Sequence, residues 1–241
     1  MATALVTGGI FFVPTILLVI GFRVFGREVA WIPLLWAGFA YLVYILLLKS
    51  RTLIPLPIFL EEVPLIWFGK ILSLSGTIAL LYFMPRVSFR AAGLTWTQNS
   101  GSLRPVIIAG AFTLIGASVT TFLFMYSPNA SLGNLLFQAT LPGLDEELFM
   151  RGLLLLLLHQ AFGKGMRIWG AETGWGFWLV VVMFGLLHGV TADSGEVQIS
   201  FGAIVATGFT GFVLTWMRER TGSLVVPILF HNVFNVAQAF V

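Results

Sequence analysis

The chain has 241 residues, of which 58% are hydrophobic and 10% are charged, and it contains 23 phenylalanines and 8 tryptophans. Soluble proteins carry about 25% charged residues, so this composition predicts a membrane protein. The net charge of +3 is spread over the polar connecting segments, which argues against nucleic-acid binding. The absence of cysteine excludes disulfides, a thiolate nucleophile and a cysteine-ligated metal.

Apolar stretches long enough to cross a bilayer recur along the whole chain. A crossing helix needs about 20 apolar residues. Eight such stretches occur, at residues 4–22, 30–48, 65–84, 106–126, 131–162, 175–192, 201–217 and 223–241. The third contains Lys70 and is the least regular of them. We therefore expect an all-α, polytopic transmembrane bundle of about eight helices, surrounded by lipid in a bacterial-type plasma membrane.

Two polar segments interrupt the apolar pattern. Residues 52–64 hold three prolines and the pair Glu61–Glu62, which is typical of an elbow at the membrane interface. Residues 86–105 form the longest polar loop. We predict an N-terminal part, residues 1–105, of transmembrane spans and elbow, and a catalytic helical core over residues 106–241.

Three short polar motifs lie inside apolar stretches of the C-terminal core. They are Glu146–Glu147 with Arg151, Phe184 with His188, and His231 with Asn235. Ionisable side chains are costly inside a bilayer unless they find partners or a wet cavity, so they indicate a functional site. Counting the crossings puts the three motifs on the same side of the membrane. We therefore expect them to converge in one intramembrane cavity.

The spacing within the first motif predicts two different roles for its carboxylates. If the fifth helix restarts at Pro142, a residue favoured in a first turn, both glutamates lie near its beginning. Glu147 and Arg151 are four residues apart and share a helix face, so they can form an ion pair. Glu146 points elsewhere, and we expect it to lack a cation and to face the cavity. A partly desolvated carboxylate without a cation suits general-base work on a water molecule.

The remaining motifs could complete a hydrolytic site. His188 could hold the same water, while His231 and Asn235 could donate hydrogen bonds to a developing oxyanion. Phe184 is expected to pack behind the site. Alternatively, Glu146, His188 and His231 could bind zinc with an open position for water. The sequence leaves metal-bound and metal-free water equally open.

Two other classes of protein are compatible with the same residues. Buried Glu, His and Arg side chains also mark conduction paths, so a proton- or ion-coupled transporter is an alternative. The chain shows no internal repeat of the kind common in transporters. A non-catalytic membrane scaffold is the third interpretation.

The motifs together resemble a known family. The patterns EExxxR, FxxxH and HxxxN, in this order on successive apolar stretches, are similar to those of the CPBP group of intramembrane proteases. That group includes type II CAAX prenyl proteases of the Ras-converting enzyme type and bacterial abortive-infection and bacteriocin-processing relatives. The resemblance covers about residues 106–241. It implies an endopeptidase acting on a peptide or protein substrate that could be prenylated, by a glutamate-dependent or a metal-dependent mechanism.

The resemblance also implies residue roles. Glu146 and His188 would activate water, His231 and Asn235 would stabilise the oxyanion, and Glu147 with Arg151 would support them. The resemblance also implies that the site is reached from the cytoplasm. The distribution of Lys and Arg instead places both termini, and the helix ends that carry the three motifs, on the outer side of the membrane. The side to which the site opens stays undecided at this point.

Overall fold

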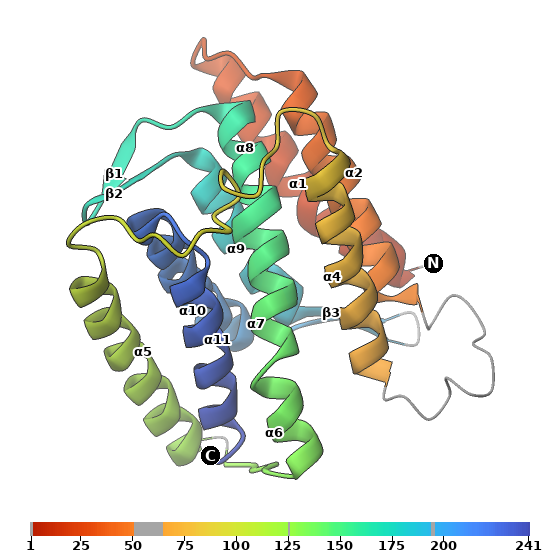
Figure 1. Cartoon of the computed structure of the whole chain (residues 1–241). Helices are drawn as coiled ribbons and strands as arrows, with labels where there is room; N and C mark the ends of the chain where they lie inside the picture. Colours follow the sequence, from red (N-terminus) through yellow and green to blue (C-terminus); the bar gives the residue numbers. More distant parts are fainter. Residues whose placement is uncertain (1, 51–64, 125, 194–195) are drawn as a thin grey trace. The chain divides into compact units, whose positions relative to one another are not determined.

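The computed structural model describes residues 2–50, 65–124, 126–193 and 196–241, and most of this part of the chain is helical (Figure 1). The first four described helices are α1 (Ala2–Val24), α2 (Trp31–Leu48), α4 (Leu65–Phe83) and α5 (Leu103–Phe124). The next segments are α6 (Leu132–Gln138), α7 (Leu141–Glu146), the π-helix η2 (Glu147–Leu154) and α8 (Leu155–Phe162). The last helices are α9 (Trp175–Gly189), α10 (Phe201–Thr221) and α11 (Val225–Gln238). The elbow predicted at 52–64 lies outside the described residues.

The described part of the chain also contains two short antiparallel hairpins, which the apolar pattern does not predict. Strand β1 (Met166–Ile168) pairs with β2 (Ala171–Thr173), and β3 (Val190–Asp193) pairs with β4 (Glu196–Ile199). The stretch predicted as a helix to residue 192 therefore ends at Gly189, because the following residues pair with β4 instead. The fifth predicted span, 131–162, is divided into α6, α7, η2 and α8.

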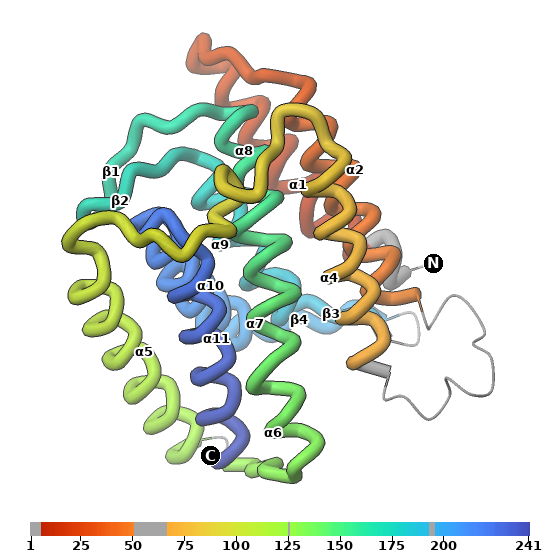
Figure 2. The backbone as a smooth tube through the Cα atoms, viewed as in Figure 1, coloured from red at the N-terminus to blue at the C-terminus, as the bar shows by residue number. Residues whose placement is uncertain are grey.

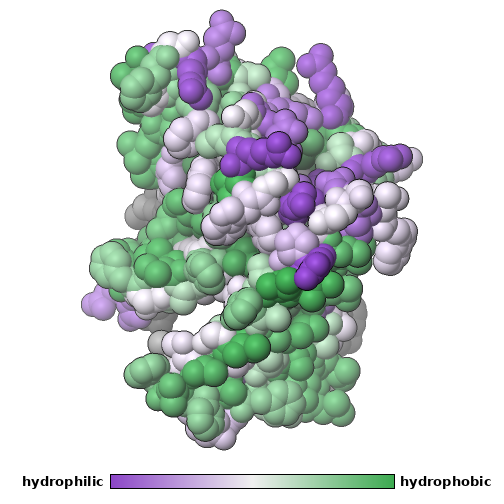
Figure 3. All heavy atoms as spheres, turned by 90° about the vertical axis from the view of Figure 1, so that its left-hand side faces the viewer, coloured by the Kyte–Doolittle hydropathy of each residue, from purple (hydrophilic) through white to green (hydrophobic). Residues whose placement is uncertain are grey.

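Among the described residues, four helices are long and apolar enough to cross a membrane. They are α1 from Val6 onward, α2, α5 and α10, and shorter apolar helices occupy α4, α9 and α11. Helix α5 exposes large apolar side chains, among them Ile107, Phe112 and Phe122. Figure 3 views the side of α5 and shows hydrophobic atoms over much of that face. Because such surface is stable in contact with lipid and not with water, the predicted all-α membrane bundle is confirmed.

The described chain forms two compact units that alternate along the sequence. Unit 1 comprises Met1–Leu42 and Leu154–Trp216, and unit 2 comprises Val43–Leu153 and Met217–Val241. The predicted division at residue 105 follows the sequence order and stays a prediction.

In unit 1, α9 packs against α1 and α8. Glycines permit close contact between α9 and α10: a Cβ on Gly211 would lie 2.8 Å from the ring of Phe184, and one on Gly185 would lie 2.7 Å from a backbone oxygen of α10. The ring of Phe184 thus packs onto α10, as expected of a residue with a packing role.

In unit 2, α7 packs against three helices, α4, α6 and α11. The tube in Figure 2 shows α6 leading into α7, with α4 and α11 beside it. A Cβ on Gly143 would lie 2.7 Å from the backbone oxygen of Ile228, so the absent side chain lets α11 approach α7 closely. The first polar motif therefore begins where α7 has close neighbours.

Candidate functional site

The motif that begins at Glu146 lies at a change of helical geometry. Thr140 precedes the first turn of α7, and Pro142 lies within that turn, which confirms the predicted restart of the helix near Pro142. At Glu147 the backbone continues as the π-helix η2. π-Helical turns are rare and often occur at functional sites, because the extra residue in the turn changes the direction of the side chains that follow.

Glu147 is the centre of a buried ionic cluster in unit 2. One of its oxygens, Oε1, accepts a hydrogen bond from Nη1 of Arg151 at 2.9 Å. The same oxygen lies 2.7 Å from Nδ1 of His231 on α11. Glu147 and Arg151 are fully buried, and His231 nearly so. The predicted Glu147–Arg151 ion pair is confirmed, and it is joined to the third motif through His231.

The contact with Glu147 restricts the hydrogen-bonding role of His231. Because an ionised carboxylate can only accept, Nδ1 of His231 carries the proton and donates it to Glu147. The other ring nitrogen, Nε2, then accepts if the ring is neutral and donates if the ring is an imidazolium. A role as an oxyanion donor therefore requires the imidazolium form. A neutral ring would instead offer Nε2 as a base or a metal ligand.

Glu146 does not lack a cation, and that prediction is wrong. Its Oε1 accepts a hydrogen bond from Nζ of Lys70 on α4 at 2.6 Å. The cause lies in the packing of α4 on α7, which brings together side chains 76 residues apart. The Glu146 side chain is only 17% exposed, so its carboxylate is largely removed from water but electrostatically balanced.

A third carboxylate, Asp145, completes the environment of Lys70. Oδ2 of Asp145 lies 3.0 Å from Nζ of Lys70 and accepts a hydrogen bond from the Tyr44 hydroxyl at 2.7 Å. Oδ1 accepts one from the Ser73 hydroxyl, also at 2.7 Å. Asp145 is fully buried. These contacts explain why an apolar helix carries Lys70, and sequence reasoning missed both Asp145 and the role of Lys70.

The two asparagines of α11 are in different environments. Oδ1 of Asn232 accepts a hydrogen bond from the backbone N–H of Gly143 at 2.8 Å, and its Nδ2 donates to the Thr140 carbonyl at 3.2 Å. Asn232 therefore joins α11 to the start of α7, a role that the motif pattern does not predict. Asn235, one turn further and half-buried, makes no side-chain hydrogen bond among the described residues. Its amide can therefore serve a ligand.

The second motif belongs to unit 1. Nδ1 of His188 lies 2.8 Å from the backbone oxygen of Phe184, one turn earlier in α9, and so donates its proton to that carbonyl. The two rings are tilted by 46° with centroids 4.5 Å apart. This intrahelical contact fixes the histidine tautomer, with Nε2 as the nitrogen available to a water or a ligand when the ring is neutral. Convergence of His188 with the residues of unit 2 stays a prediction.

The donor set proposed for zinc fits these contacts poorly. Oε1 of Glu146 is held by the ammonium group of Lys70, and a metal cation there would be repelled by it. In the part of the chain that the structure describes, no group of three His, Asp or Glu side chains is arranged to hold a metal ion. Zinc bound by Glu146, His188 and His231 stays a prediction from the sequence.

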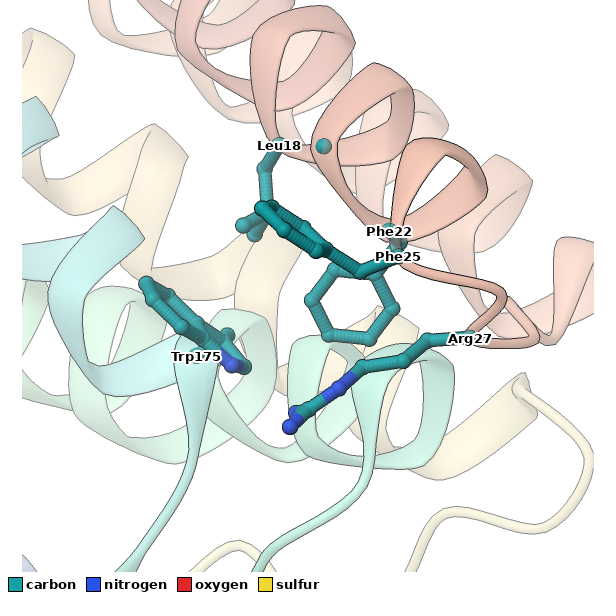
Figure 4. A pocket seen from close by; sticks show the side chains of 6 residues that line it. Leu18, Phe22, Phe25, Arg27 and Trp175 are labelled. Carbon is teal, nitrogen blue, oxygen red and sulfur yellow. The ribbon is translucent and has the colours of Figure 1, made fainter.

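A separate cavity of about 500 Å³ lies in unit 1, between the end of α1 and the start of α9. Figure 4 shows its walls, formed by Leu18, Phe22, Phe25 and Trp175, with the Arg27 side chain at one side. It is lined mainly by apolar groups, and its lining contains none of the motif residues. The cavity therefore does not serve as the hydrolytic centre.

Comparison with known families agrees with the resemblance. Residues 128–237 match the family model of type II CAAX prenyl endopeptidase Rce1-like proteins. The matched segment contains every residue of the three motifs, whereas Lys70 lies outside it. No match to the chain was found among curated proteins or among solved structures.

Proposed function

We propose that the chain, which matches the Rce1-like family of type II CAAX prenyl endopeptidases over residues 128–237, is an integral membrane protease of the CPBP group. We propose further that it cleaves peptide bonds with water activated by Glu146 and His188. His231 and Asn235 are proposed to stabilise the oxyanion. Glu147 and Arg151 hold His231 in place. We place the protein in a bacterial-type plasma membrane as part of the same proposal.

The reaction can be written with side chains alone. Glu146 takes a proton from water while the oxygen attacks the carbonyl carbon of the scissile amide, and His188 orients that water. The carbonyl oxygen becomes an oxyanion that accepts hydrogen bonds from His231, as an imidazolium, and from Asn235. Glu146 then returns the proton to the amide nitrogen as the carbon–nitrogen bond breaks. The products are a carboxylic acid and an amine, and the glutamate regains its charge.

The observation that best supports this proposal is the contact between His231 and Glu147 in unit 2. It joins a motif on α11 to a motif at the start of η2 through a buried hydrogen bond of 2.7 Å. Random polar residues on two apolar helices have no reason to meet at one buried carboxylate. The adjacent Glu146 is ion-paired yet partly exposed, as a base must be to receive water.

The family name suggests the class of substrate. Type II CAAX prenyl endopeptidases are named for cleavage of prenylated peptides, so we propose a peptide with a prenylated cysteine near its C-terminus. Wild-type protein in liposomes should release a C-terminal fragment from a farnesylated peptide, detected by mass spectrometry. The same peptide without the farnesyl group measures the need for prenylation.

The same liposomes separate the proposal from its rivals. A transporter would move protons or ions across the liposome membrane without cleaving the peptide, which a pH-sensitive dye inside the liposomes would report. A scaffold would do neither. Absence of cleavage of either peptide by folded wild-type protein would contradict the proposed function.

A further inference from the structure

We infer that Lys70 is a positioning residue of the hydrolytic site, which keeps the Glu146 carboxylate ionised and fixes its orientation. This inference rests on the proposed function and extends it to a residue outside the three motifs and outside the matched segment. Lys70 is 93% buried, and its ammonium group lies 2.6 Å from Oε1 of Glu146.

The ammonium group is held from a second side by Asp145. The distance from Nζ of Lys70 to Oδ2 of Asp145 is 3.0 Å. Tyr44 and Ser73 donate hydrogen bonds to the two oxygens of Asp145, so this carboxylate is fixed by three donors. The contacts therefore form a chain. The hydroxyl groups of Tyr44 and Ser73 hold Asp145, Asp145 holds Lys70, and Lys70 contacts Glu146.

The side chains of Tyr44 and Ser73, at the start of this chain of contacts, are themselves held in place. The rings of Tyr44 and Phe149 stack with centroids 3.8 Å apart and an interplanar angle of 6°. The hydroxyl oxygen of Ser73 also lies 2.9 Å from the Gly69 carbonyl oxygen one turn earlier in α4, a position that restricts its rotamer. Lys70, normally a flexible side chain, is thus held in one geometry, and it transmits that geometry to the Glu146 carboxylate.

Electrostatics give the lysine its function. A carboxylate in a poorly hydrated site tends to bind a proton, and a protonated Glu146 could not accept one from water. A cation in direct contact favours the ionised form. If the pair served stability alone, apolar side chains of similar volume would do as well or better, since burying two charges costs much of what their attraction returns.

Enzyme kinetics provide the first test. Lys70→Met should lower kcat at least tenfold and leave KM within about twofold, because Lys70 acts on the base and not on substrate binding. Lys70→Arg keeps the charge and should recover part of the lost rate. Lys164→Met, which removes an exposed lysine in unit 1, is the control and should retain wild-type kcat. Wild-type kcat in folded Lys70→Met would overturn the inference.

A double variant guards against unfolding. Lys70→Met alone leaves Asp145 buried without a cation, which is destabilising. Lys70→Met combined with Asp145→Asn removes both charges, and this variant should fold. It should have the same low kcat as Lys70→Met, since Glu146 still lacks its cation. Recovery of wild-type kcat in this double variant would show that Lys70 serves Asp145 alone.

Infrared spectroscopy tests the inference without using activity. Lys70→Met should show the carbonyl band of a protonated carboxyl group that wild-type protein lacks. Adding Glu146→Gln should remove the part of the band that Glu146 contributes, and adding Asp145→Asn should leave that part in place. The reverse pattern, or no band, would overturn the inference even if peptide cleavage were unaffected. Inactive wild-type protein, together with the expected band in Lys70→Met, would instead contradict the proposed function and leave the role of Lys70 toward Glu146 supported.

Discussion

His231 and Glu147 are 84 residues apart in the sequence, yet Nδ1 of the histidine lies 2.7 Å from Oε1 of the glutamate. Arg151 donates to the same oxygen. Oε1 of Glu147 thus orients the imidazole ring of His231 and balances the charge of Arg151, and all three side chains are buried. This arrangement makes Glu147 a support of the site and distinguishes it from its neighbour Glu146, which contacts Lys70.

The support given by Glu147 predicts a loss of stability when its charge is removed. Glu147→Gln removes the carboxylate charge that the buried Arg151 contacts, and such a change costs about 3–5 kcal/mol. We expect the free energy of unfolding in mixed micelles to fall by that order. Glu172→Gln, which alters an exposed glutamate, should leave it unchanged. Equal unfolding midpoints for the two variants would contradict the supporting role.

The two asparagines of α11 should respond differently to alanine. Asn232→Ala removes the acceptor of the Gly143 N–H, and an unsatisfied buried donor costs about 1–3 kcal/mol, so stability should fall while kcat changes little. Asn235→Ala removes no hydrogen bond among the described residues, so stability should hold. Its kcat should fall by about 10²-fold or more if its amide stabilises the oxyanion. Paired measurements of unfolding and kcat check both, and an unchanged kcat for Asn235→Ala would remove it from the mechanism.

The participation of His188 can be tested by combining variants. If Glu146 and His188 act on the same water, each single variant removes most of the catalysis. The double variant Glu146→Gln with His188→Ala should then be no slower than the slower single variant. Independent roles would instead give rate losses that multiply. Single-turnover rates with one peptide substrate decide between the two outcomes.

The zinc alternative yields a separate prediction. The ammonium group of Lys70 contacts the carboxylate of Glu146 and so opposes metal binding there. We therefore expect peptidase activity to survive dialysis against a chelator. Elemental analysis of the dialysed protein should find less than one zinc per chain. Loss of activity with the metal, and its return on adding zinc, would move the mechanism to metal-bound water.

The helical fold could be predicted because bilayer thickness imposes a simple length rule on apolar sequence. The expected helices at 30–48 and 65–84 agree with α2 and α4 to within one residue at each end. The hairpin after Gly189 and the division of 131–162 were not predictable in this way. The hairpin depends on backbone pairing and the division depends on helix packing. Neither changes the number of consecutive apolar residues, on which the prediction was based.

The site could be predicted in part. The Glu147–Arg151 pair follows from helical spacing, and the three motifs follow from their rarity in apolar sequence. The partner of Glu146 could not be found by spacing, because Lys70 comes from another helix and the contact forms only when α4 packs on α7. The sequence did show that Lys70 lies inside an apolar helix. It did not show which carboxylates of the chain Lys70 contacts.

The central claim is that Glu146 activates the water that cleaves the peptide. The most direct measurement compares kcat of wild-type protein and Glu146→Gln on the same peptide in liposomes, with unfolding midpoints measured for both. If Glu146 has this role, kcat should fall about 10²–10⁴-fold in a protein that remains folded. A folded Glu146→Gln variant that cleaves the peptide at the wild-type rate would contradict it.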